Sequence, residues 1–208
     1  IVNGKIVLHD RVIEDHVIIF TDQIINIVTE EEFNKEDIEI IDAHGNYVGP
    51  GFIDLHIHGS KGFDVMDGNQ EALTEISSAI VKNGVTSFLP TTMTMELDAI
   101  YQALEEIRRA KNGTLTGAQV LGAHLEGPFI SPEYKGAQNE EYIREPDYNL
   151  IKDYLDIIEI ITYAPEEDDD FSFLSSVLQG KGNPVLSLGH TNANYKEAVA
   201  AINQGVEH

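Results

Sequence analysis

Short apolar runs alternate with segments of helical periodicity over most of this chain. The apolar runs cover residues 52–57, 86–90, 119–125, 157–163 and 184–188. The segments with helical spacing that follow them cover residues 70–83, 97–111, 149–155, 169–179 and 195–203. Strands that alternate with helices of this length are typical of βαβ units, whose strands are parallel. The pattern therefore predicts an α/β fold with five strand-helix units.

The first 48 residues have a different pattern. Short β-branched runs, separated by turn-forming residues, cover residues 1–8, 11–20, 23–29 and 38–42. Residues 30–37 have the acidic composition of a turn or a short helix. This spacing predicts a small antiparallel β unit. Four short strands do not easily bury two faces alone, so we expect the unit to pack against something else.

Composition narrows the classes of function. The chain has 208 residues, with 13 Lys and Arg against 36 Asp and Glu, for a net charge of −23. Such acidity argues against nucleic acid and against an anionic membrane surface as partners. The chain has no cysteine, which excludes disulfides and thiolate chemistry. No window reaches the roughly 18 apolar residues of a membrane helix, and the first residues do not resemble a signal peptide, so we expect a soluble, cytoplasmic protein.

Two histidines lie at the end of the first strand of the α/β region. His56 and His58 occur in Phe52–Gly59, where the two-residue period of a strand places them, with Asp54, on one side. Two imidazoles that point the same way can bind one metal ion. The alternative is a pair of hydrogen-bonded histidines near a turn.

Two further strand ends carry residues that bind metals. Glu126 ends the third strand, where a carboxylate must be paired, protonated or bound to a cation, or else caps a helix from a loop. His190 ends the fifth strand, where a lone histidine is more often a core or capping residue. The carboxyl ends of parallel strands lie on one rim, so these residues and the two histidines of the first strand predict one site for zinc or iron. The remaining candidates, expected at the surface, are His9, His16 and His44.

Three motifs give the chain a family resemblance. Pro50–Gly59 resembles the opening motif of the amidohydrolase superfamily, which metal-dependent hydrolases share widely. His124–Phe129 and Gly189–Ala193 are narrower and resemble the N-acetylglucosamine-6-phosphate deacetylase family. This resemblance implies a (β/α)8 TIM-type barrel of which about five βα units are present. It also implies that residues 1–48 are the N-terminal part of a small β-sandwich domain and that residues 49–208 are an incomplete barrel.

The resemblance implies an activity and roles for particular residues. The reaction is the metal-dependent hydrolysis of the acetamide of an amino-sugar phosphate, N-acetyl-D-glucosamine 6-phosphate, to D-glucosamine 6-phosphate and acetate. Glu126 and His190 resemble ligands of the hydrolytic metal, and His56 and His58 resemble the pair that binds a second metal, so one or two divalent ions, zinc or iron, are expected. Ala137 and Gln138 correspond to a segment that lines the sugar pocket. A homodimer is also implied.

The resemblance also places part of the machinery outside this sequence. The aspartate that acts as general base in the family follows the eighth strand, so we expect it beyond His208 and expect these residues alone to be inactive. The part after residue 48 is shorter than the roughly 250 residues of a complete barrel. Two alternatives stay open: another hydrolase of the superfamily, acting on cyclic amides or purines, or a non-catalytic module that binds a metal or a sugar.

Overall fold

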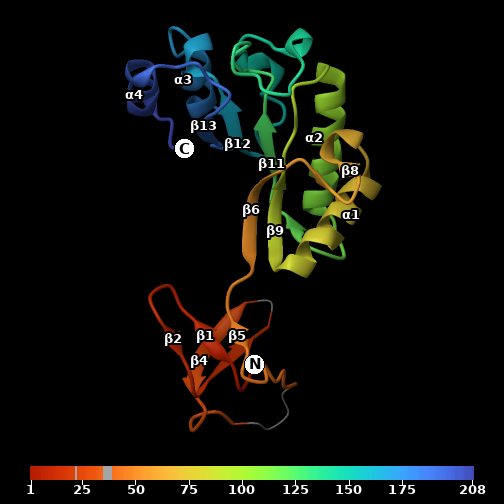
Figure 1. Cartoon of the computed structure of the whole chain (residues 1–208), viewed down its shortest axis with the longest axis vertical. Coiled ribbons are helices and arrows are strands. Elements are labelled where there is room, and N and C mark those ends of the chain that lie inside the picture. Colours follow the sequence, from red (N-terminus) through yellow and green to blue (C-terminus); the bar gives the residue numbers. More distant parts are fainter. Residues whose placement is uncertain (22, 35–38) are drawn as a thin grey trace. The chain divides into compact units, whose positions relative to one another are not determined.

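The chain divides into two compact units, Ile1–Gly51 and Phe52–His208. The computed structural model shown in Figure 1 describes residues 1–21, 23–34 and 39–208. Each unit has its own strands and its own buried residues, and each is described by itself below. That the two units are a β-sandwich domain and a barrel domain stays a prediction.

The first unit consists of short strands in two small sheets. Strand β1 (Lys5–Val7) lies between β2 (Val12–Ile13), to which it is antiparallel, and β5 (Tyr47–Val48), to which it is parallel. Strands β3 (His16–Phe20) and β4 (Ile24–Thr29) form an antiparallel pair. The unit therefore has the β character that its sequence predicts, but the expectation of an antiparallel unit is wrong for the pair of β1 and β5, which is parallel.

Two further details of this unit differ from the expectation. The run 11–20 forms two strands because Asp15, with a φ of 58°, adopts a left-handed conformation between them. In the run 38–42, residue 38 lies outside the described residues, and the rest contributes only a bridge between Asp42 and Val2 rather than a strand. The end of the acidic segment 30–37 also lies outside the described residues, and its described part forms a turn.

The second unit is built on parallel strands that follow the chain order. The strands are β6 (Phe52–Ile57), β9 (Val85–Pro90), β10 (Gln119–Val120), β11 (Ala123–Glu126), β12 (Ile158–Tyr163) and β13 (Val185–Leu188). Strand β9 pairs with β6 and β10, and β12 pairs with β11 and β13, all in parallel. Thr91 and His124 form a bridge that joins the two groups, so β10 and β11 continue each other across one break. Four of the five apolar runs after residue 49 are thus confirmed as single strands, and the run 119–125 forms two short strands, β10 and β11.

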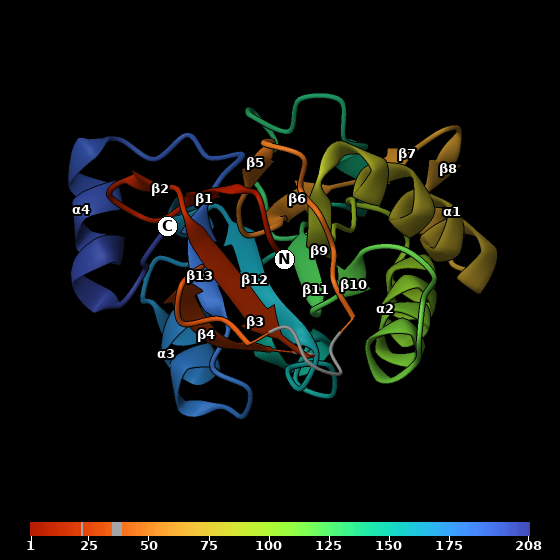
Figure 2. The ribbon, with the colours of Figure 1, turned by 90° about the horizontal axis from the view of Figure 1, so that it is seen from below.

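Four helices lie outside these strands, as Figure 2 shows: α1 and α2 beside β9 and β10, and α3 and α4 beside β13. They are α1 (Gln70–Ile80), α2 (Leu97–Asn112), α3 (Ser172–Gln179) and α4 (Tyr195–Gln204). Side-chain caps begin two of them: Asn69 accepts the N–H of Ala72, and Asn194 forms a capping box with Glu197. The periodic segments correctly predict these four helices.

The prediction of a helix at 149–155 is wrong. A 3-10 turn covers Tyr148–Leu150, and tight turns such as the one from Tyr154 N–H to the Ile151 carbonyl (2.9 Å) follow it. Within this segment the Arg108 guanidinium of α2 donates to the Asp153 carbonyl at 2.9 Å. Seven residues are too few to form a stable helix by themselves, whatever their local periodicity.

Small elements at the ends of the strands complete the unit. The hairpin of β7 (Gly59–Ser60) and β8 (Phe63–Asp64) follows β6. The other 3-10 helices are Val65–Asp67, Val81–Asn83, Glu140–Tyr142 and Pro165–Glu167. Among the residues that the structure describes, no helix is long and apolar enough to cross a membrane.

The core lies between the strands and the helices. Phe88, Leu125 and Ile161 of three neighbouring strands are fully buried, and so are Leu104 and Ile107 on the inner face of α2. These side chains fix the positions of the strands to which the polar residues are attached. Burial of one large apolar side chain contributes about 1.5–3 kcal/mol, so the strand ends are held by packing well before any ligand is bound.

Candidate metal centre

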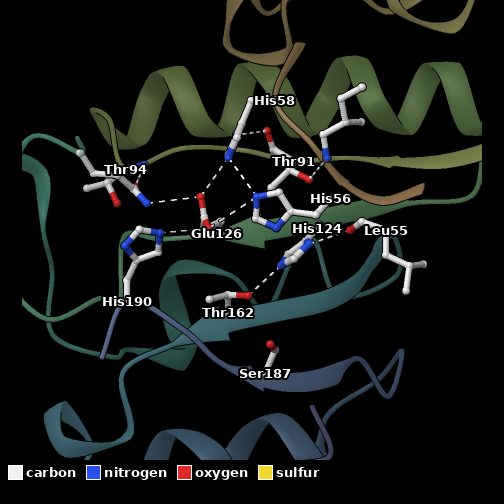
Figure 3. A network of polar contacts seen from close by, with 12 residues as sticks. Leu55, His56, His58, Thr91, Thr94, His124, Glu126, Thr162, Ser187 and His190 are labelled. Atoms are coloured by element: carbon white, nitrogen blue, oxygen red, sulfur yellow. Dashed lines mark hydrogen bonds and ion pairs between the residues drawn. The ribbon is translucent and has the colours of Figure 1, made fainter. Parts of the chain in front are cut away.

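Three imidazoles surround the carboxylate of Glu126 at the end of β11 (Figure 3). The Nε2 atoms of His58 and His190 lie 3.1 and 3.2 Å from its oxygens, and Nε2 of His56 lies 3.6 Å away. The Nε2 atoms of His56 and His58 are 3.1 Å apart, whereas His190 approaches from the other side of the carboxylate. The structure therefore brings together the four residues that we expected at one site, from the ends of three strands; below they are called the cluster.

Burial and charge act in opposite directions on this carboxylate. Glu126 is only 5% exposed, and burial alone would raise its pKa. The hydrogen bond from His58 and the positive charges of His56, His58 and His190 lower its pKa below the ordinary value. The same hydrogen bond raises the pKa of His58, although burial opposes that shift. An ionised carboxylate in this position needs positive charge beside it.

The outer nitrogens of two rings are held by backbone carbonyls. Nδ1 of His58 lies 3.2 Å from the Thr91 carbonyl, and Nδ1 of His190 lies 2.9 Å from the Tyr134 carbonyl. A carbonyl only accepts, so each Nδ1 carries a proton, and Nε2 is the nitrogen that faces the cluster and whose lone pair would bind a metal once its own proton is released. Histidines that bind metals are usually held in this way. With ligand atoms of His56, His58 and Glu126 within 4.8 Å of one another, the donor set fits a divalent metal such as zinc or iron.

Strand β6 positions its two histidines with the help of neighbouring polar groups. Asp54, which we placed on the same side as the histidines, accepts the backbone N–H of His56 at 3.1 Å and does not join the cluster. The pairing of β6 with β9 is irregular between Asp54 and Ile57, and the buried hydroxyl of Thr91 accepts the N–H of Ile57 at 3.0 Å. Simple alternation along a strand could not reveal this irregularity.

A buried histidine beside the cluster had no expected role. His124 is 3% exposed, its Nδ1 lies 2.8 Å from the Leu55 carbonyl, and its Nε2 lies 2.7 Å from Oγ1 of Thr162. Its ring meets the ring of His56 edge-on at 4.8 Å. Burial lowers the pKa of His124 to about 4, so the ring is neutral at pH 7. Nδ1 donates to Leu55 and Nε2 accepts from Thr162, which leaves no lone pair for a metal. The two-residue period that places His124 on the side of Glu126 was the available signal.

The two residues expected near a sugar differ in their contacts. Gln138 is 4% exposed, its amide donates to Oε2 of Glu126 at 3.3 Å, and its carbonyl accepts the N–H of Thr94 at 2.7 Å. Ala137 is exposed. Both line a cavity of about 400 Å³ at the carboxyl ends of the strands, together with all three methionines of the chain, Met66, Met93 and Met95.

The other histidines considered lie away from the cluster. The side chains of His9 and His44 are 92% and 79% exposed, as expected for surface residues. His16 is partly buried, with Nδ1 2.6 Å from the Glu14 carbonyl. None of the three contributes to a group of ligand atoms among the described parts of the chain.

Comparison with known proteins identifies the family. The model of the amidohydrolase family matches residues 47–208. The chain belongs to this family. It is 38% identical over 211 residues to the N-acetylglucosamine-6-phosphate deacetylase of Bacillus subtilis, covering 98% of this chain and 53% of that protein. It is also 31% identical to the N-acetylgalactosamine-6-phosphate deacetylase of Escherichia coli O157:H7, covering 82% of this chain and 46% of that protein.

The fold agrees with a solved structure. The crystal structure of N-acetylglucosamine-6-phosphate deacetylase from Pasteurella multocida has a TM-score of 0.87 and 31% identity, covering 99% of this chain and 54% of that one. The amidohydrolase family is of TIM-barrel type and metal-dependent, which confirms the family resemblance and the general fold class. The chain spans about half the length of the relatives it matches.

Proposed function

We propose that the cluster is the metal centre of an amino-sugar-phosphate deacetylase. Glu126 and His190 hold the hydrolytic divalent ion, and His56 and His58 hold a second ion where two are bound. The carboxylate with three converging imidazoles supports this assignment more than any other observation, because such a buried charge needs a cation or protonated partners. Zinc or iron suits nitrogen and oxygen donors of this kind.

Several residues of the chain have distinct roles at this centre. A bound divalent ion polarises a carbonyl and lowers the pKa of water. Glu126 supplies a negative charge that stays ionised because its pKa is lowered. The Thr91 and Tyr134 carbonyls hold the proton of His58 and of His190 on Nδ1. Gln138 donates to the Glu126 carboxylate and so fixes its orientation. Because Gln138 also lines the cavity, it can contact a substrate and Glu126 at the same time.

The substrate that we propose is N-acetyl-D-glucosamine 6-phosphate, cleaved to D-glucosamine 6-phosphate and acetate. Relatives named for two 2-acetamido sugar phosphates support the class, and those named for the glucosamine compound favour it within the class. Ala137 and Gln138 line the cavity next to the cluster and are proposed to contact the sugar. The proton of the attacking water passes to an aspartate that we expect beyond His208, as general base catalysis requires.

The architecture of the whole protein is part of the proposal. We infer that residues 49–208 form about five units of a (β/α)8 barrel and that residues 1–48 belong to a small β-sandwich domain. The backbone N–H groups of Glu207 and His208 bond to the Leu186 carbonyl of β13 at 3.1 and 3.2 Å, in the position of a next strand. A homodimer is proposed from the resemblance, and the sedimentation of the purified protein tests it.

A substrate panel tests the proposed reaction. The protein produced from the complete gene, freed of metal and reconstituted with zinc or iron, should release acetate from N-acetyl-D-glucosamine 6-phosphate and leave hydantoin, dihydroorotate and adenine unchanged. Turnover of a cyclic amide or a purine instead would favour the alternative hydrolases. Metal binding without turnover of any compound would favour a non-catalytic module.

A further inference from the structure

The loop that follows β13 is held by carboxylates from two other segments. Glu166, in the 3-10 helix Pro165–Glu167 after β12, accepts the hydroxyl of Thr191 with one oxygen and the backbone N–H of Asn192 with the other. Glu133, in the loop after β11, accepts the side-chain amide of Asn192 at 2.6 Å. The segment that carries His190 is therefore fixed immediately after the histidine, by groups that do not belong to the cluster.

His190 needs such support because its backbone is strained. Its φ of 50° lies in the left-handed region, which residues other than glycine adopt only where their surroundings hold them there. Its carbonyl accepts the N–H of Ser131 at 2.8 Å, and its Nδ1 is bound by the Tyr134 carbonyl at 2.9 Å. These contacts hold the residue from the side of the 131–134 loop, and Glu166 holds it from the following residues.

We propose that Glu166 is a positioning residue for the metal centre: its two oxygens lock Thr191 and Asn192 and thereby keep Nε2 of His190 directed to the carboxylate of Glu126. This inference rests on the proposed function, because it takes His190 to be a metal ligand. Glu166 does not touch the cluster, so it acts through the loop. The Thr191 hydroxyl also accepts the N–H of Ala193 at 2.9 Å, so the same group of hydrogen bonds continues into the turn before α4.

Glu166 offers a discriminating test because an exposed glutamate follows it directly. Glu166→Ala removes both carboxylate oxygens that accept from Thr191 and Asn192. Glu167→Ala is the control, because it removes the same charge one residue further along. Groups that support metal ligands from behind typically contribute 10–100-fold to metal affinity. We expect Glu166→Ala to bind zinc about tenfold more weakly or worse, and Glu167→Ala to bind it as the parent does.

The experiment measures zinc affinity by competition with a chromophoric chelator, in the protein produced from the complete gene. The visible spectrum of the cobalt-substituted protein, which reports the number and geometry of ligands, is recorded beside it. A change in that spectrum in Glu166→Ala, with partial recovery in Glu166→Gln, supports the positioning role. If Glu166 only stabilised the fold, its removal would lower the unfolding temperature and leave the metal ligands unchanged. An unchanged affinity and spectrum in Glu166→Ala would overturn the inference.

Two outcomes separate this inference from the proposed function. If the parent protein binds no zinc or cobalt, the metal centre itself is wrong. If the parent binds metal and releases acetate while Glu166→Ala matches it, only the role of Glu166 is wrong. Should Glu166→Ala be insoluble, Thr191→Val removes the hydroxyl from the same group of hydrogen bonds, and we expect its affinity for zinc to fall in the same direction; parent-like affinity in that variant counts against the inference.

Discussion

His124 bridges two strands, and from its two hydrogen bonds we predict how much its replacement lowers the free energy of unfolding. His124 joins the backbone of β6, through the Leu55 carbonyl, to Thr162 on β12, and both bonds lie beneath the cluster. In His124→Leu the side chain keeps a similar volume, so the main loss is polar. The hydroxyl of Thr162, which is 5% exposed, is left without its acceptor at a cost of about 1–3 kcal/mol, and losing the bond to the carbonyl costs about 1 kcal/mol more. We therefore expect the free energy of unfolding to fall by about 2–4 kcal/mol.

A double-mutant cycle measures this directly. Thr162→Val in the His124→Leu background removes the orphaned hydroxyl and should restore about 1–2 kcal/mol, although Thr162→Val alone destabilises the protein. His124→Asn is the matched control, because its amide can still donate to the Leu55 carbonyl, and we expect it to lose about half as much. The assay is urea unfolding of the metal-free protein. A coupling free energy within about 0.5 kcal/mol of zero would refute the reasoning.

Three further predictions concern the strand ends. Glu126→Gln should abolish acetate release and metal binding while the far-ultraviolet circular dichroism stays that of the parent; retained metal content would contradict the assignment of the carboxylate. Thr91→Val leaves the partly buried N–H of Ile57 without its acceptor and should cost about 1–3 kcal/mol in urea unfolding, whereas Thr91→Ser should cost less because it keeps the hydroxyl. Gly189→Ala places a Cβ 2.5 Å from Cγ2 of Thr162, so the strand end next to His190 must shift; we expect a lower unfolding temperature and weaker zinc binding, and parent values for both would show that Thr162 moves aside freely.

The strand ends were predictable because two simple rules act there. Apolar runs of five to seven residues locate the strands, and polar residues within two positions after such runs have to lie at one rim of a parallel array. His58, Glu126 and His190 obey both rules, and the structure places all three together. The helices with clear caps and apolar faces, such as α1, followed from periodicity in the same way.

What could not be predicted depends on contacts between distant segments. The bond from His124 to Leu55 spans 69 residues, and the one from Glu166 to Thr191 spans 25, so neither partner appears in the local pattern. The same holds for 149–155, where Arg108 of another helix donates to the Asp153 carbonyl across 45 residues. Local sequence indicates which residues can do chemistry, whereas packing decides which of them is free to bind a metal.

Acetate release with and without metal shows whether the cluster around Glu126 is a catalytic metal centre. The protein produced from the complete gene is stripped with a chelator, reconstituted with one or two equivalents of zinc or iron, and given N-acetyl-D-glucosamine 6-phosphate. We expect no release from the stripped protein, full recovery on reconstitution, and none in Glu126→Gln under either condition. Equal rates in the stripped and reconstituted protein, or activity in Glu126→Gln, would contradict a metal centre built on Glu126.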